Sequence, residues 1–334
     1  MKIYYGTGTI WGECYDAAVK PREDTDKIWS RNFQPFFVYQ FNANASALEG
    51  VKHAQQINKD DILLLQWSTY SSTEYEDALI DEINRRGGRI VALVHDVDFL
   101  RFGSGQEKII QVLNKMNHLI LPNKKMHSIL KMSGLQKDGK IVYQNCWDFL
   151  TDEQLEYRTN RESKVIYAGS LTDTKIEFMK NLQSPLEVIG DSSDDICSLS
   201  PHITFLGRMN QEKLIRHING NIGLIWSSGN YANYELYNSS YKAAMYIAAN
   251  VPIICKSDSA ISNFIVKHNL GVAIPTIDLL DCAKNKILEN PQKYNQPSIV
   301  ENIRNGRMMT NCTNKVFAMM EGLTWVIENL IKKQ

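Results

Sequence analysis

Short runs of consecutive apolar residues alternate with longer amphipathic stretches along the first half of the chain. The runs are continuously apolar, which is typical of parallel strands that are covered on both faces. The predicted strands lie at 3–5, 36–39, 61–67, 89–95, 118–122 and 140–143. Helices are expected between them at 74–86, 107–114 and 124–132. A steady succession of strand and helix predicts a doubly wound α/β sheet.

The same alternation begins again after a polar segment at 151–163, which is the best linker candidate. Further strands are predicted at 164–169, 186–190, 203–207, 222–226, 251–255 and 271–274, with a helix expected at 175–181. We therefore expect two tandem Rossmann-like doubly wound domains, at 1–155 and 160–312, with a deep cleft between them. Ligands of such sheets bind beside glycine-rich turns and helix N-termini at the carboxyl ends of the strands.

A last amphipathic stretch occupies 313–334 and carries its apolar residues on one stripe. A stripe of this kind usually packs on a core. It predicts a long C-terminal helix that packs back toward the first domain.

The segment at 237–254 reads as a polar loop, a short helix, a turn and a buried strand. Ser239 or Ser240 can cap the helix, and Asn250 suits its left-handed end. Lys242, however, lies in the first turn, where the helix dipole disfavours a cation. A bound diphosphate would accept hydrogen bonds from Lys242 and from the first-turn N–H groups. The alternative, that Lys242 reaches into water, is equally compatible with the spacing.

Three other loops of the second half end at the same sheet edge. Gly169 and Ser170 follow one strand, Arg208 follows another, and Trp226 ends a third. Glycine allows close backbone approach to a ligand, and the arginine fork suits a phosphate. Each also has a plain structural interpretation: an ordinary turn, a surface arginine or a core tryptophan. Their convergence favours a ligand site.

In the first half, Gly6-Thr7-Gly8-Thr9 lacks the third glycine of a dinucleotide fingerprint, so a nicotinamide site is disfavoured. His95 and Asp96 end a buried strand. They could act as a general base and its orienting partner, or cap the loop structurally. Asp96 and Asp98 are only weak indications of a metal site.

Composition narrows the function classes. The 334 residues are 43% hydrophobic and 22% charged, with 37 basic and 37 acidic side chains, typical of a globular protein without a nucleic-acid footprint. No apolar run reaches the roughly 18 residues that suggest a membrane span. The first residues lack a signal-peptide pattern. The six cysteines are scattered, which favours reduced thiols in a cytoplasmic protein and disfavours a zinc site.

Several longer segments resemble one known family. These are DILLLQWSTYSSTEYEDALIDEINRRGGRIVALVHDVDFLRF, LILPNKKMHSILKMSGL and QNCWDFL in the first half, and VIYAGSL, FLGRMNQEKL and YNSSYKAAMYIAANVPIICKSDSAISNFI in the second. They resemble the bacterial glucosyltransferases that modify serine-rich repeat adhesins, which are nucleotide-sugar-synthetase-like and similar to β-1,6-galactofuranosyltransferases. The resemblance implies a GT-B architecture, a UDP-sugar donor, no obligate metal or other cofactor, and a homo-oligomer, a dimer or tetramer.

The resemblance also implies roles for residues of the second domain. Gly169, Ser170 and Leu171 would line the donor cleft, and Arg208 would lie near the nucleotide. The donor phosphates would be bound by Asn238, Tyr241 and Lys242, with Lys242 also assisting catalysis. Ser240-Tyr241 replaces the Pro-His pair of many relatives, and Asn250 replaces a glycine.

In the first domain, the resemblance places the loop at 6–11, including Gly8 and Thr9, against the donor sugar. Gln66, Trp67, His95 and Asp96 would bind the acceptor, with Asp96 and His95 as catalytic candidates. This loop differs from the Ser/Thr-rich form of relatives, which leaves the sugar open.

The resulting hypothesis is a cytoplasmic glycosyltransferase that moves a hexose, glucose or N-acetylglucosamine, from a UDP-sugar to a GlcNAc-modified serine-rich repeat adhesin. One alternative is a galactofuranosyl- or other hexosyltransferase of surface polysaccharide synthesis. An alternative of another class is a non-catalytic UDP-binding partner subunit of a glycosyltransferase.

Overall fold

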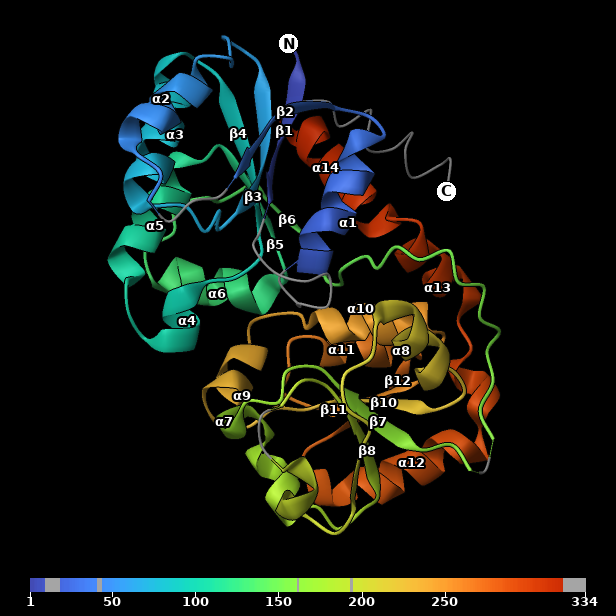
Figure 1. The fold of residues 1–334 in the computed structure, drawn as a ribbon. Helices are drawn as coiled ribbons and strands as arrows, with labels where there is room; N and C mark the ends of the chain where they lie inside the picture. The colour runs from blue at the N-terminus through green and yellow to red at the C-terminus, as the bar shows by residue number, and fades with distance from the viewer. Residues whose placement is uncertain (10–18, 41–43, 161, 193–194, 321–334) are drawn as a thin grey trace. The chain divides into compact units, whose positions relative to one another are not determined.

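A computed structural model describes the chain except for residues 10–18, 41–43, 161, 193–194 and 321–334. The chain forms two compact units (Figure 1). The first unit contains residues 1–144 and the segment that starts at Met309, and the second contains residues 145–308. The chain thus passes from the first unit to the second at 144–145, earlier than the expected boundary at 155–160.

The first unit is built on a six-stranded parallel sheet with the order β2-β1-β3-β4-β5-β6. Its strands are β1 (Ile3–Thr9), β2 (Gln34–Gln40), β3 (Ile62–Trp67), β4 (Arg89–Val94), β5 (His118–Leu121) and β6 (Ile141–Tyr143). The central strands β3 and β4 are almost wholly buried, as their continuous apolar sequences predict. The strand order reverses between β1 and β3, which is where a ligand crevice forms in sheets of this kind.

The helices of the first unit follow the predicted alternation, and several have side-chain caps. They are α1 (Val19–Ser30), α2 (Ala47–Ala54), α3 (Thr73–Arg85), α4 (Asp98–Phe102), α5 (Gln106–Lys115), α6 (Lys124–Met132) and α14 (Arg307–Met320). Ser46 and Glu49 form a capping box on α2, and Asn123 accepts a hydrogen bond from the N–H of Met126 at the start of α6.

The last described helix, α14, begins six residues earlier than the predicted C-terminal helix. From Met309 onwards it belongs to the first unit, where the Trp29 indole donates to the Thr313 hydroxyl at 3.2 Å. The rings of Phe33 and Phe317 pack edge to face at 5.6 Å. The remainder of the predicted helix, from 321, lies outside the described residues.

The second unit has its own six-stranded parallel sheet with the order β12-β11-β10-β7-β8-β9. Its strands are β7 (Val165–Ala168), β8 (Leu186–Ile189), β9 (Ile203–Phe205), β10 (Ile222–Ile225), β11 (Ile253–Lys256) and β12 (Gly271–Ile274). The predicted doubly wound α/β class is therefore confirmed for both halves. The strand order reverses between β7 and β10, so the loops that follow these two strands flank a ligand crevice.

Short helices and 3₁₀ turns connect these strands. The helices are α7 (Asp173–Ile176), α8 (Gln211–Ile218), α9 (Gly229–Glu235), α10 (Tyr241–Ala248), α11 (Ser262–Lys267), α12 (Leu280–Glu289) and α13 (Pro297–Arg304). The 3₁₀ turns are Glu177–Asn181, Ile196–Leu199, Ile277–Leu279 and Pro291–Tyr294. The helix predicted at 175–181 is thus a single α-turn followed by a 3₁₀ turn.

The polar segment that was predicted as a linker belongs to the second unit. Arg158 donates to the Asn219 side chain at 2.8 Å, and the Leu155 carbonyl accepts from the side chains of Asn250 and Arg304. These hydrogen bonds fix an extended chain without regular structure to the unit, so polarity alone does not mark a linker here.

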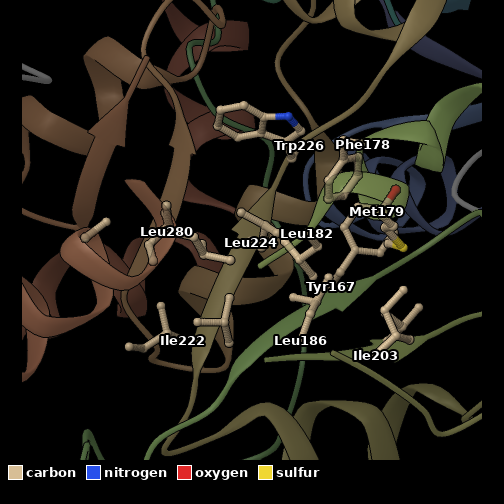
Figure 2. Close-up of a cluster of buried hydrophobic side chains, with 14 of the residues drawn as sticks. Tyr167, Phe178, Met179, Leu182, Leu186, Ile203, Ile222, Leu224, Trp226 and Leu280 are labelled. Carbon is tan, nitrogen blue, oxygen red and sulfur yellow. The ribbon is translucent and has the colours of Figure 1, made fainter. Parts of the chain in front are cut away.

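Helices cover both faces of the second sheet, with α8 and α10 opposite α12 (Figure 1). Figure 2 shows the core on the α12 face, where Tyr167, Leu224 and Trp226 pack with Phe178 and Leu280. Trp226 is a core residue, as its structural interpretation in the sequence predicts. This packing fixes the carboxyl ends of β7 and β10, from which the loops of the candidate site begin.

Candidate functional site

Tyr246 of α10 lies at the point where β7 and β10 stop pairing. These two strands pair only at Val165 with Ile222 and at Ile166 with Gly223. The Tyr246 hydroxyl accepts from the Ala168 N–H at 3.0 Å and lies 3.0 Å from the Ile166 carbonyl, to which it can donate. A Cβ at Gly223 would lie 2.5 Å from the Tyr246 ring. The phenol therefore replaces further strand pairing at the point where the sheet order reverses.

Gly169 is the first residue after β7 and contacts the side chain of Lys242. Its φ of +145° is a conformation that other residues rarely adopt. A Cβ at this position would lie 2.7 Å from Lys242 Cε and 3.3 Å from Nζ. Gly190, after β8, is packed as closely, since its Cβ would lie 2.2 Å from the Gly169 carbonyl oxygen. Gly169 thus leaves room for the lysine, and Gly190 leaves room for the loop that carries Gly169.

The Lys242 ammonium group is buried and lacks a hydrogen-bond acceptor among the described residues. Its Nζ lies 3.9 Å from the centroid of the Tyr167 ring, whose face attracts a cation. Burial lowers the pKa of Lys242 well below its usual value; the positive charge of Lys175 lowers it further, and the negative charge of Glu235 opposes this. A buried amine without an acceptor is costly unless a ligand supplies one.

Lys242 lies in the first turn of α10, as the sequence predicts. Ser240 precedes this helix but forms no side-chain cap on it. Helix N-termini present unpaired N–H groups that bind anions. The lysine and the helix end are therefore compatible with the same anionic ligand.

Hydrogen bonds hold the segment after β10 against α7 and the 3₁₀ turn that follows it. The Ser228 hydroxyl accepts from the Phe178 N–H at 2.8 Å, and the Ser228 N–H donates to the Lys175 carbonyl at 2.8 Å. The Ser227 hydroxyl donates to Glu235 Oε1 at 2.6 Å. These contacts place α9 and α7 beside each other at the carboxyl edge of the sheet.

The loop before α10 is fixed by the first residues of the second unit. The Trp147 indole donates to the Ser239 carbonyl at 3.0 Å, and the Ser239 hydroxyl donates to the Asn145 carbonyl at 3.2 Å. The rings of Phe149 and Tyr241 lie 5.5 Å apart. The segment that carries Asn238, Tyr241 and Lys242 is thus rigidly supported.

The first unit has a polar cluster at the carboxyl ends of β3 and β4. Gln66 Oε1 lies 2.7 Å from His95 Nε2, and the Gln66 amide donates to the Arg22 carbonyl at 3.1 Å and to Asp26 at 2.7 Å. Since both amide hydrogens point to acceptors, the Gln66 oxygen faces His95, and Nε2 carries the imidazole proton. Burial and the charge of Arg22 lower the His95 pKa well below its usual value. His95 is therefore a neutral imidazole.

Arg22 also belongs to this cluster. Its guanidinium donates to the carbonyl oxygens of Gln66 at 3.3 Å and Ser68 at 2.7 Å, and lies 4.9 Å from the centre of the Tyr70 ring. Burial lowers the pKa of Arg22, and the charges of Tyr70 and Asp96 oppose this. Asp96 itself is half-buried and lies 3.8 Å from the Arg101 guanidinium. The cluster combines a neutral imidazole, a carboxylate and buried positive charge.

Residues 4–146 match the glucosyltransferase 3-like N-terminal domain, and residues 165–316 match the glucosyltransferase 3-like C-terminal domain. The chain belongs to the glucosyltransferase 3-like family. It is a glycosyltransferase.

Individual relatives agree with this assignment. The chain is 23% identical to glucosyltransferase 3 of Streptococcus gordonii over 80% of its own length and 81% of that protein. It is 22% identical to glucosyltransferase 3 of Streptococcus parasanguinis, over 86% of each chain. The β-1,6-galactofuranosyltransferase WbbI of Escherichia coli K12 is 25% identical over 68% of this chain and 71% of WbbI.

Solved structures show the same fold. An α-glucosyltransferase in complex with UDP-glucose and DNA containing an abasic site has a TM-score of 0.59 and 12% identity, and the match covers 96% of this chain and 99% of that chain. The structure of accessory secretory proteins 1, 2 and 3 of Streptococcus pneumoniae has a TM-score of 0.51 and 12% identity, over 83% of this chain and 57% of that chain. These likenesses identify the GT-B class of two Rossmann-like units. Among the described residues, no helix is both long and apolar enough to span a membrane.

The structure brings together several of the residues predicted for the glycosyl donor, although it tests none of their roles. Gly169 and Lys242 are in contact, Leu171 is buried beside Gly190, and Ser170 is exposed in the same loop. Asn238 lies on the supported loop before α10, and Tyr241 is the first residue of that helix. Arg208 is exposed after β9 and lies 3.4 Å from Asp191.

The residues predicted for the acceptor have different environments. Trp67 is 3% exposed, and its indole donates to Glu76 at 3.3 Å, so its side chain serves the core. Gln66 and His95 are buried in one hydrogen-bonded cluster, and Asp96 is the more exposed of the predicted acceptor group. Their roles toward an acceptor stay predictions.

One predicted loop is largely a strand. Gly8 and Thr9, expected in a loop that starts at Gly6, lie in β1, where they pair with Tyr39 and Gln40 of β2. The prediction was wrong because Gly-Thr-Gly-Thr has no apolar pattern that would indicate a strand. Backbone pairing with β2 nevertheless extends the strand through these residues, whatever their side chains. The remainder of the predicted loop, Ile10 and Trp11, lies outside the described residues.

Sequence reasoning missed Arg22, Glu235 and Tyr246. Each is an ordinary residue in its local sequence and becomes notable only through partners far along the chain.

Of the described side chains, no three His, Cys, Asp or Glu residues gather in a way that could hold a metal ion. Arg101 lies 3.8 Å from both Asp96 and Asp98, which gives this carboxylate pair a counter-charge.

Proposed function

We propose that this glycosyltransferase moves a hexose from a UDP-sugar to a hydroxyl group of an acceptor sugar. The observation that carries the proposal is Lys242, whose buried Nζ has no hydrogen-bond acceptor in the described part of the chain and lies against Gly169 at the N-terminus of α10. A diphosphate supplies acceptors for both the ammonium and the N–H groups of the helix end.

In the proposed reaction, the bond between the sugar C1 and the diphosphate oxygen breaks, and a bond forms between C1 and the acceptor oxygen. The departing UDP gains negative charge, which Lys242 and the first turn of α10 stabilise. Because both are fixed before the reaction, they need little reorganisation as the charge develops.

The acceptor hydroxyl loses its proton in this reaction. We propose that Asp96 accepts it, since Asp96 is a half-buried carboxylate at the end of a buried strand. His95 is buried as a neutral imidazole and orients the cluster through Gln66. Asp96→Asn should therefore lower turnover while UDP binding is unchanged; full activity of this variant would exclude Asp96 as the base.

Glucose is the favoured sugar, because two of the relatives are named glucosyltransferase 3. The WbbI relative keeps galactofuranose as a second candidate at similar identity. The natural acceptor is proposed to be a GlcNAc-modified serine-rich repeat adhesin, an inference from the family resemblance. The enzyme is further proposed to work in the cytoplasm, where UDP-sugars are made, as a homo-oligomer that requires no metal.

A panel of UDP-sugars with a GlcNAc acceptor, with and without a chelator, tests the proposal. Transfer from UDP-glucose in the presence of chelator is expected, and transfer from UDP-galactofuranose alone would support the WbbI-like alternative. Lys242→Met should abolish transfer and weaken UDP binding, whereas Lys267→Met, which changes an exposed lysine of α11, should do neither. UDP binding without turnover of any donor would favour the non-catalytic subunit, and unchanged UDP affinity of Lys242→Met would refute the site.

A further inference from the structure

Basic side chains gather at the amino ends of three neighbouring strands of the first unit. Arg89 begins β4, His118 begins β5, and Lys140 directly precedes β6. Val91, two residues after Arg89, is the register partner of His118, and the Leu119 N–H donates to the Lys140 carbonyl at 3.0 Å. Alternate residues of a strand share a face of the sheet, and so do paired residues. Arg89, His118 and Lys140 therefore lie side by side on one face of this edge.

A fourth basic side chain, Lys137, lies in the turn before β6. The Lys140 N–H donates to the Lys137 carbonyl at 3.1 Å and closes this turn. Lys137 is only 9% exposed, yet no hydrogen bond or ion pair joins its ammonium group to a described residue. Burial lowers the pKa of Lys137, and the positive charge of Lys140 lowers it further. Burial of an amine beside a like charge is costly unless an anion accompanies it.

The carboxylates of the neighbouring segments are engaged elsewhere. Asp138, in the same turn, forms an ion pair with Lys131 at 2.8 Å. Asp61 accepts hydrogen bonds from two backbone N–H groups, at 2.7 and 3.1 Å. Arg89 donates to the backbone carbonyl of Asp60 at 3.2 Å and forms no ion pair with a described carboxylate. The positive charge of the cluster is therefore not neutralised by the part of the chain that the structure describes.

Two nitrogen atoms of the cluster are also buried without a hydrogen-bond partner among the described residues. They are Nε of Arg89 and Nδ1 of His118. Burial lowers the pKa of His118 to about 4, and the charges of Lys140, Lys137 and Arg89 act in the same direction. His118 is thus a neutral imidazole, and the formal charge of the cluster comes from one guanidinium and two ammonium groups.

We propose that Arg89, Lys137 and Lys140, with the imidazole of His118 between them, bind a phosphate group. A phosphate dianion has several acceptor oxygens and supplies the negative charge that the cluster lacks. The site is at the amino ends of the strands, whereas Asp96 follows the carboxyl end of β4. Its ligand is therefore neither the sugar donor nor the acceptor, and the inference does not depend on the proposed function.

NMR of the imidazole groups of the full-length protein tests the inference, with the His118 resonance assigned through His118→Gln. Titration with inorganic phosphate should shift this resonance in a saturable way. Lys137→Met keeps the buried stem and removes the charge, so it should weaken the phosphate affinity by about 10- to 100-fold, as expected for hydrogen bonds to a charged group. Lys124→Met changes an exposed lysine of α6 and should leave the affinity unchanged.

A second variant keeps the test valid if Lys137→Met does not fold. Lys140 is exposed, so Lys140→Met should fold normally and weaken phosphate binding by a smaller factor. Sodium acetate at the same ionic strength tests whether the cluster requires a phosphate, because acetate carries one negative charge and two acceptor oxygens. It should shift the His118 resonance only weakly.

Two further probes separate the sources of the phosphate group. Glycerol 3-phosphate carries the group in solution, and phosphatidylglycerol vesicles carry it on a lipid surface. Lys137-dependent binding of glycerol 3-phosphate would support a soluble phosphorylated ligand, and Lys137-dependent binding of the vesicles alone would support a lipid headgroup.

Three results would overturn the inference: no response of His118 to any phosphate probe, an equal response to acetate, or the same affinity in Lys137→Met and Lys124→Met. The His118 resonance reports on this cluster and not on Lys242. A failure here is therefore distinguishable from failure of the protein to bind UDP.

Discussion

Gly169 leaves the space that the Lys242 side chain occupies. A Cβ at Gly169 would lie 2.7 Å from Lys242 Cε and 3.3 Å from Nζ, and the glycine has a φ of +145°. The loop after β7 therefore needs glycine for its backbone conformation and also for contact with the lysine. The position of the ammonium group depends on this residue.

Gly169→Ala should displace Lys242 and weaken UDP binding by about 10-fold or more, because the added methyl overlaps the lysine and the backbone becomes strained at about 1–3 kcal/mol. Gly207→Ala is the matched control, since Gly207 also has a positive φ, +69°, but no atom of the described residues lies within 4 Å of its Cβ position. It should lose stability without losing UDP affinity. Calorimetry and thermal unfolding measure the two effects, and equal UDP affinity of Gly169→Ala and the unmodified protein would contradict the prediction.

Tyr246→Phe should destabilise the second unit. The hydroxyl satisfies the buried Ala168 N–H, and its loss leaves this donor without a partner at a cost of about 1–3 kcal/mol. Tyr294→Phe removes the hydroxyl of another buried tyrosine, which forms no hydrogen bond with the described residues, and should therefore cost less than Tyr246→Phe. Chemical denaturation compares the two variants. A Tyr246→Phe protein as stable as Tyr294→Phe would show that the phenol does not maintain the ends of β7 and β10.

Much of the fold could be predicted because its signal is local. The runs at 61–67 and 89–95 are apolar without interruption, and the structure has buried strands there. The helix α6 has the predicted bounds, with Asn123 as its cap. The end of β1 could not be predicted, because Gly6–Thr9 are held by pairing with β2. The boundary between the units also depends on contacts between distant residues, such as those of Arg158 and Asn219.

The candidate site was predictable only where a residue breaks a local rule. Lys242 is a cation at a helix N-terminus, and this anomaly is visible in the sequence. Glu235 breaks no local rule, because a glutamate at the end of a polar helix is ordinary. Its importance follows from the burial of Oε2 and the nearby lysines, which are properties of the folded chain.

UDP affinity should fall as the pH rises from 7.5 to 9. The pKa of Lys242 is lowered well below 10.5 in the free protein by burial and by Lys175, against the opposing charge of Glu235. A bound diphosphate favours the ammonium form, so binding takes up a proton wherever the pH exceeds the pKa of the free protein. The affinity then decreases by up to about tenfold per pH unit.

Calorimetry in buffers of different ionisation enthalpy measures this proton uptake directly. Lys242→Met should show a flat pH dependence, and the Glu235→Gln background removes any titration of that carboxyl group. An affinity of the unmodified protein that is independent of pH over this range would mean that Lys242 keeps an ordinary pKa.

Acidification should destabilise the first unit through His95. The folded-state pKa of His95 is well below its unfolded value of about 6.5, so below pH 6.5 the unfolded chain binds a proton that the folded chain does not. The free energy of unfolding should therefore fall with decreasing pH, by up to about 1.4 kcal/mol per pH unit for this one group.

His95→Gln retains an amide donor for Gln66 and should show a shallower fall between pH 7 and 5 in chemical denaturation. His118, whose pKa is lowered to about 4 chiefly by burial, acts in the same direction, so His118→Gln should also flatten the profile. Identical slopes for His95→Gln and the unmodified protein would show that the imidazole beside Gln66 is protonated in the folded chain.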